Sequence, residues 1–155
     1  IIELMGGDRA LAEGPATEIY EEWAAHDHFA LYDDVEATLR RLADRGFRIG
    51  LISNGHRSLT TFPSHFALDG LISVAVSSLD LGFMKPHPNI FRAALELAGV
   101  PAHAAVMVGD SYPHDVLGAR AVGMRPVLIA RGDRPTPEDP EMTVIRSLTE
   151  LPDLL

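Results

Sequence analysis

The stretch AAVMVGDSYPHD, residues 104–115, decides the fold of this chain. A short apolar segment runs into a glycine, and two aspartates, Asp110 and Asp115, follow it. A continuous apolar run of this length, bounded by a turn residue, is typical of a strand in a parallel sheet. We therefore expect a strand at residues 104–108. A helix should follow from Pro113, where the N–H that proline lacks is not needed.

The same alternation of strand and helix extends outward in both directions. Strands are expected at 47–52, 71–76, 104–108 and 126–130, with a short one at 143–145, and helices at 8–25, 35–45, within 57–67, at 88–98, 113–122 and 148–154. Strands that alternate with helices predict an α/β fold built on a doubly wound parallel sheet. The helix after Asp34 should be capped by the carboxylate of Asp33 or Asp34.

The bulk composition narrows the classes of function. The 155 residues carry a net charge of −9 and no cysteine. The charge argues against nucleic acid and anionic membranes as partners, although a small phosphorylated substrate needs only a local cation. The missing cysteines exclude disulfides and thiolate chemistry. No apolar run approaches the ~20 residues of a membrane span, so we expect a cytoplasmic protein.

Polar residues after the strands are the candidates for a site, because ligands of such sheets bind beyond the carboxyl ends of the strands. Ser53, Asn54 and Gly55 follow the first strand, and the hydroxyl and amide can bind phosphate oxygens. An ordinary turn would use the same three residue types. Lys85 stands among prolines and offers a point charge to a phosphoryl group, or it is a solvated surface lysine.

Asp110 and Asp115 predict a metal site. Two neighbouring carboxylates suit Mg²⁺, which prefers hard oxygen ligands and retains several waters. Helix capping alone would explain one of these acids but not both. The loop with Arg131 and Arg134 is interpreted as solvated charge without a catalytic role. His56 and His114 are interpreted as surface residues, although either could touch a substrate.

These motifs, in this order, resemble those of the haloacid dehalogenase superfamily. The matching residues are Leu51-Ile52-Ser53-Asn54, then Lys85-Pro86, then Gly109-Asp110-Ser111 with Asp115 and Gly118-Ala119. The resemblance covers roughly residues 33–130. It implies a Rossmann-like core, which we place at 33–155, and the remnant of a helical cap with its connector at 1–32.

The resemblance also implies roles for the site residues. Ser53 looks like the hydroxyl that binds the transferring phosphoryl group, supported by Asn54. Lys85 resembles the lysine that neutralises the charge of the nucleophile and the phosphoryl group. Asp110 looks like the Mg²⁺ ligand, and Asp115 resembles its acidic partner. The implied activity is a Mg²⁺-dependent phosphatase of small phosphorylated metabolites that works through a phosphoaspartate.

One family motif does not occur in the sequence. The family's nucleophile is the first aspartate of an Asp-x-Asp motif on the central strand, and residues 1–155 contain no Asp-x-Asp. We therefore expect the central strand and its nucleophile upstream of Ile1, a gap in the sheet, and an inactive chain when residues 1–155 stand alone. Two alternatives stay open: a 2-haloacid dehalogenase, and a relative without a nucleophile that binds but does not catalyse. The substrate and the oligomeric state are beyond the sequence.

Overall fold

The computed structural model describes residues 30–55 and 59–155. Residues 31–155 form one compact unit. The helix expected at 8–25 and the proposed cap remnant therefore lie outside the described residues, as does His56. Within the described ranges, none of the helices has the length and apolar character needed to cross a membrane.

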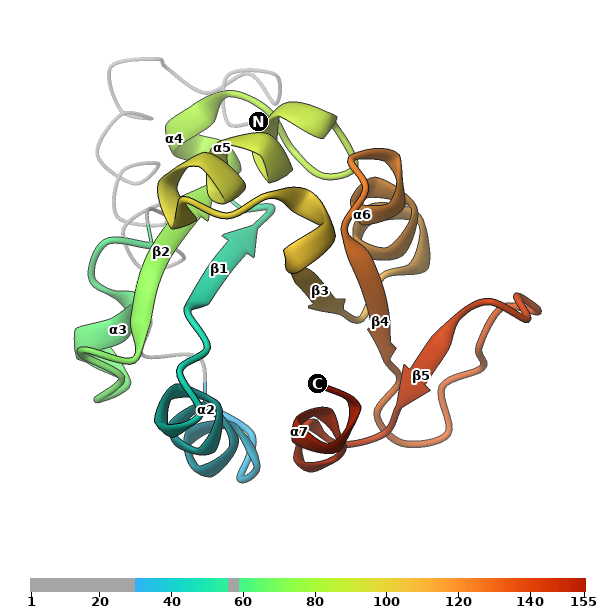
Figure 1. Ribbon diagram of the computed structural model, residues 1–155, viewed down its shortest axis with the longest axis horizontal. Coiled ribbons are helices and arrows are strands. Elements are labelled where there is room, and N and C mark those ends of the chain that lie inside the picture. Colours follow the sequence, from blue (N-terminus) through green and yellow to red (C-terminus); the bar gives the residue numbers. More distant parts are fainter. Residues whose placement is uncertain (1–29, 56–58) are drawn as a thin grey trace, which may run out of the picture. The chain divides into compact units, whose positions relative to one another are not determined.

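The first sheet consists of two parallel strands, β1 (Ile49–Ser53) and β2 (Ile72–Ser77) (Figure 1). Their register pairs Ser53 with Ser77, so both strands end at the same level of the sheet. The serines at these ends have different surroundings. Ser77 is fully buried and caps the short helix α4 (Ser78–Leu81), with its hydroxyl accepting from the N–H of Asp80.

The second sheet holds three parallel strands in the order β3 (Val106–Gly109), β4 (Arg125–Ile129) and β5 (Thr143–Ile145) (Figure 1). The strand predicted from residues 104–108 begins two residues later, because Ala102–Ala104 form a single 3₁₀ turn. All the strand pairs in the described residues are parallel. The predicted α/β class with parallel strands is confirmed.

In the described residues the strands form two separate sheets. Among the described residues, β1 pairs only with β2, and β3 pairs only with β4. The side chains of β1 are half-buried and Gly50 is exposed, although the apolar run at 47–52 is typical of a strand buried on both faces of a parallel sheet. An unpaired strand edge leaves the neighbouring side chains less covered than they are inside a continuous sheet.

Apart from α4, which was not predicted, the helices of the described residues lie at the predicted positions, and most of them are shorter than expected. They are α2 (Val35–Asp44), α3 (Phe62–His65), α4, α5 (Pro88–Ala98), α6 (Leu117–Ala121) and α7 (Leu151–Leu154), with a π-helical turn at Tyr112–Val116 before α6 and a 3₁₀ turn at Leu148–Glu150 before α7. Two were predicted closely. Helix α5 has the expected bounds, and α2 ends next to Gly46, whose φ of 85° is the left-handed conformation expected after a helix.

Two hydrophobic clusters support the sheets. The first is centred on Phe91 and Ile90 of α5, both fully buried, and it includes Val74 and Val76 of β2. The second gathers Leu42, Val127, Ile129, Ile145 and Leu151. Helix α5 approaches α6 so closely that a Cβ on Gly118 would lie 2.6 Å from the Phe91 ring. Only glycine fits there. Helix α6, which follows the loop that carries Asp110 and Asp115 (the acidic loop), is therefore packed closely against α5.

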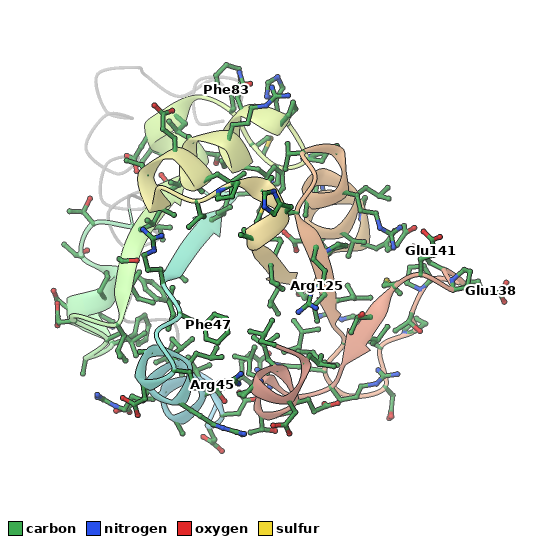
Figure 2. The ribbon with its side chains drawn as sticks, viewed as in Figure 1. Arg45, Phe47, Phe83, Arg125, Glu138 and Glu141 are labelled. Atoms are coloured by element: carbon green, nitrogen blue, oxygen red, sulfur yellow. The ribbon has the colours of Figure 1, made fainter. Side chains whose placement is uncertain are left out.

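Figure 2 shows the side chains as sticks and labels several that lie outside the two clusters. Phe83 points outward beyond α4, and its ring stacks on His87 with centroids 4.5 Å apart. The guanidinium of Arg45 lies 5.2 Å from the ring centroid of Phe47. Glu138 and Glu141 stand at the exposed end of the loop before β5.

Candidate active site

The end of β1 is tied to the loop that carries Lys85. The side chain of Asn54 donates from Nδ2 to the carbonyl oxygen of Lys85 at 2.8 Å, and its Oδ1 accepts from the N–H of Lys85 at 2.6 Å. The peptide bond between Lys85 and Pro86 is cis. A strand end and a loop far apart in sequence are thus joined through the backbone N–H and carbonyl oxygen of one residue, Lys85.

The lysine continues the connection to the acidic loop. Its Nζ donates to Oδ1 of Asp115 at 2.6 Å, and the two side chains are only 12% and 4% exposed. The prediction that Lys85 is held by its surroundings, rather than solvated, is therefore supported by the geometry. A buried ion pair of this kind must be complete, because either charge alone would be strongly destabilising.

Asp115 packs directly against the end of β3. A Cβ on Gly109 would lie 2.3 Å from Cγ and Oδ2 of Asp115, so the carboxylate occupies the space that any other residue at 109 would fill. Oδ2 accepts from the N–H of Ser111 at 2.9 Å. The turn that follows is capped by Ser111, whose hydroxyl accepts from the N–H of His114 and also contacts its Nδ1. The exposed His114 side chain thus contacts the hydroxyl of the residue that caps the turn.

Asp110 has a different environment. Its Oδ2 accepts from Nη1 of Arg134 at 2.8 Å, and both side chains are more than half exposed. The loop that presents Arg134 is fixed by Arg146, whose Nη1 donates to the carbonyl oxygens of Ala130, Gly132 and Arg134. Arg134 was expected to be solvated charge; it remains exposed, but it contacts the predicted Mg²⁺ ligand.

The remaining predicted residues lie around this line of contacts. Ser53 is the last residue of β1, next to Asn54. The N–H of Gly55 donates to the hydroxyl of Ser78 at 3.0 Å, and that hydroxyl donates to the carbonyl oxygen of Gly55. Ser53, Asn54, Lys85 and Asp115 thus belong to one continuous set of neighbours, and Asp110 lies on the same loop as Asp115.

The donor set agrees in kind with a Mg²⁺ site. Mg²⁺ is commonly held by one or two carboxylates, completed by waters and substrate oxygens. Asp115 has both oxygens engaged, by Lys85 and by the Ser111 N–H, whereas Asp110 is bound only by a movable surface arginine. Across residues 30–55 and 59–155 there is no group of three or more acidic or histidine side chains suited to a metal. Of the two carboxylates, that of Asp110 is 65% exposed and that of Asp115 only 4% exposed.

A second polar cluster was missed by the sequence analysis. Asp34 accepts two hydrogen bonds from Arg131, at 2.8 and 2.9 Å, and others from the Ser147 hydroxyl and the Leu148 N–H. The guanidinium of Arg131 also lies 3.9 Å from the ring centroid of Tyr32. The hydrogen bonds from Arg131, together with those from Ser147 and Leu148, hold the pKa of Asp34 far below its ordinary value of 3.8.

Two predictions are corrected by this cluster. Asp34 stands at the N-cap position of α2 but makes no side-chain hydrogen bond to that helix. Its carboxylate instead caps the turn that begins at Leu148. Arg131 is not solvated charge, since its side chain is 25% exposed and paired on a carboxylate. No local pattern marks such a contact, because its partners lie more than ninety positions apart.

The parallel strands, with polar residues at their carboxyl ends, define an α/β protein with a candidate site at one edge of its sheets. The family model described as "haloacid dehalogenase-like hydrolase" matches residues 4–123. The chain belongs to this family. The resemblance inferred from the ordered motifs around Ser53, Lys85 and Asp110 is confirmed.

Two relatives show how similar this chain is to other members of the family. Haloacid dehalogenase-like hydrolase domain-containing protein 3 of Danio rerio is 34% identical, over 94% of this chain and 61% of its own length. A phosphoserine phosphatase of Thermus thermophilus is 36% identical, over 90% of this chain and 55% of its own length. The chain thus spans little more than half the length of these relatives.

Solved structures show the same fold. A 2-haloacid dehalogenase from Pseudomonas syringae pv. Tomato superposes with a TM-score of 0.80 at 31% identity, covering 99% of this chain and 65% of that one. A phosphatase of the same superfamily from Thermococcus onnurineus gives a TM-score of 0.65 at 32% identity, covering 80% of this chain and 57% of that one. Both activities that the sequence analysis left open occur among these structures.

Proposed function

We propose that residues 1–155 are part of a Mg²⁺-dependent phosphatase that acts on small phosphorylated metabolites in the cytoplasm through a phosphoaspartate. The observation that carries this proposal is the line of contacts from Asn54 through Lys85 to Asp115. It brings the carboxyl ends of β1 and β3 to one place, where a phosphoryl group would meet a hydroxyl, an ammonium and two carboxylates.

Each residue then has a distinct role. The Ser53 hydroxyl donates a hydrogen bond to a phosphoryl oxygen, and Lys85 neutralises the charge that develops during transfer. Asp115 holds the Lys85 ammonium in place, while Asp110 would hold the cation. When bound, Mg²⁺ would supply charge neutralisation for the phosphoryl oxygens. Neither nucleic acid nor a membrane is needed as a partner.

The nucleophile is proposed to be an aspartate on a strand contributed from outside residues 1–155. Two observations support this. The described sheets leave one edge each of β1 and β3 without a strand partner, and the chain covers only part of its relatives. Nucleophilic attack by a carboxylate, followed by hydrolysis, divides phosphate-ester cleavage into two easier steps.

The alternative is dehalogenation of 2-haloacids by the same covalent chemistry without a metal. The superposition with the P. syringae 2-haloacid dehalogenase favours it. The second carboxylate favours the phosphatase, because a reaction that needs no metal has little use for Asp110 beside Asp115. A binding relative without a nucleophile is the third candidate, and it would retain Lys85 and both carboxylates without chemical need.

The test uses the complete reading frame that encodes these residues, with all upstream sequence. We expect an intact mass above the 16.8 kDa of residues 1–155, and hydrolysis of p-nitrophenyl phosphate that requires Mg²⁺ and is abolished by EDTA. Residues 1–155 alone should be inactive. EDTA-resistant turnover of 2-haloacids would establish the dehalogenase instead. An intact mass of 16.8 kDa without either activity would establish the non-catalytic relative.

A further inference from the structure

We infer that Asn54 is a positioning residue, whose amide fixes the backbone from which Lys85 reaches the acidic loop. The resemblance implied that Asn54 supports substrate binding. The geometry points to a different task, because the amide is turned toward protein backbone at both of its polar atoms. This inference rests on the proposed function, since the position of Lys85 matters only if Lys85 meets a phosphoryl group.

The Asn54 side chain makes two hydrogen bonds to the backbone of Lys85, and together they fix the orientation of that backbone. Nδ2 of Asn54 donates to the carbonyl oxygen of Lys85 at 2.8 Å, while Oδ1 accepts from the N–H of the same residue at 2.6 Å. Rotation of Lys85 about one of these bonds would break the other. Both are partly buried, where water competes less for the same groups.

The lysine is consequently held at both ends. Lysine carries its charge on a flexible four-carbon stem, so its ammonium is normally mobile. Here its backbone is fixed by Asn54 and its Nζ by Asp115 at 2.6 Å. The N–H of Ser111 holds the other oxygen of Asp115 at 2.9 Å. A charge restrained in this way loses little entropy when a phosphoryl group arrives, which is the benefit of preorganisation.

The side chain at position 54 must be both a donor and an acceptor. The backbone of Lys85 offers one N–H and one carbonyl oxygen, and a carboxamide, with one acceptor oxygen and an NH₂ donor, matches both. Aspartate would keep the acceptor but place a charged oxygen against the Lys85 carbonyl. Alanine would supply neither group. The backbone of Gly55, next to Asn54, is held separately by hydrogen bonds with the Ser78 hydroxyl, so its position does not depend on Lys85.

The first experiment measures the mobility of Lys85 without any catalysis. The Lys85 amine is acylated with acetic anhydride in the complete protein, and its modification rate is followed by mass spectrometry. Asn54→Ala should raise this rate about tenfold, the effect of losing one to two net hydrogen bonds, and Asn54→Asp should lie between Ala and wild type. Ser78→Ala, which removes the neighbouring contact to Gly55, is the matched control and should leave the rate unchanged. Equal rates for Asn54→Ala and wild type would overturn the inference.

The second experiment separates positioning from substrate binding. In Mg²⁺-dependent turnover of p-nitrophenyl phosphate, Asn54→Ala should lower kcat with little change in KM, because Lys85 acts on charge that develops in the transition state. In the Lys85→Met background, Asn54→Ala should cost nothing more. A raised KM with unchanged kcat, or an undiminished effect without Lys85, would return Asn54 to substrate binding. If Lys85→Met itself is harmless, the proposed function fails, while the acylation rates still decide the role of Asn54.

Discussion

Lys85 and Asp115 form a buried ion pair whose Nζ and Oδ1 lie 2.6 Å apart, between a loop after β2 and the turn after β3. The pair joins elements of both sheets. Both charges are almost removed from water. A change that moves one partner therefore leaves the other as a buried charge without compensation, which destabilises the fold.

Gly109→Ala should disturb the pair without removing a charge. The added Cβ would lie 2.3 Å from Asp115, so the carboxylate must move away from Lys85. We expect a loss of about 3 kcal/mol in the free energy of unfolding, the upper range for overpacking. Urea unfolding measures it. Gly50→Ala is the control, since its Cβ would meet Val74 at 3.3 Å and should cost less. Equal losses in the two variants would contradict this packing argument.

Arg134→Gln should make Asp110 more accessible to a cation. The arginine must leave Asp110 before a metal can bind, but an exposed pair contributes only about 0–1 kcal/mol. The affinity for Mn²⁺, measured by titration calorimetry, should therefore increase by no more than about fivefold. Arg40→Gln breaks an equally exposed pair with Glu36 and should have no effect on Mn²⁺ binding. Weaker binding in Arg134→Gln would show that Arg134 assists the site instead.

Asp34→Asn should reduce stability in a pH-dependent manner. The folded-state pKa of Asp34 is lowered, so its carboxylate stabilises the fold above its ordinary pKa of 3.8, and this contribution is lost as the pH falls below that value. We expect a loss of roughly 2 kcal/mol at neutral pH, from weaker hydrogen bonds to Arg131. The difference from wild type should shrink between about pH 5 and about pH 2. A difference independent of pH would argue against the charge of Asp34 as the cause.

Asp139→Asn should shift the titration of a tyrosine. Asp139 accepts from the Tyr112 hydroxyl at 2.9 Å and from Arg120 at 2.6 Å, and the bond to this carboxylate raises the pKa of Tyr112. Removing the negative charge should bring the Tyr112 pKa back toward its usual value, about 10. Ultraviolet absorbance of tyrosinate at alkaline pH measures the shift. Glu138→Gln, on the same exposed loop, should leave the titration unchanged.

Local signals in the sequence were sufficient for much of the fold. Helix α5 was predicted with its observed bounds because Pro88 marks its first turn and Gly99, with a φ of 63°, ends it. Strand β5 was likewise predicted at its observed position. Helix α4 was missed, since four residues following directly on β2 carry too little periodicity to separate them from the strand.

Strand ends, glycine and paired aspartates in the sequence single out Ser53, Lys85, Asp110 and Asp115 as candidates for the site, but they do not predict the contacts between them. The partner of each side chain depends on tertiary contacts, and no local pattern encodes those. For this reason the sequence did not show that Asn54 faces the backbone of Lys85, or that Arg134 reaches Asp110.

The divided sheet has a consequence for how residues 1–155 behave on their own. Within the described ranges, β1 and β3 each present a row of backbone donors and acceptors without a strand beside it. Such edges pair readily with the edges of other molecules and promote aggregation. The net charge of −9 opposes that association through repulsion between copies. The solubility of the isolated chain should therefore fall as salt screens this charge, well before the fold itself is lost.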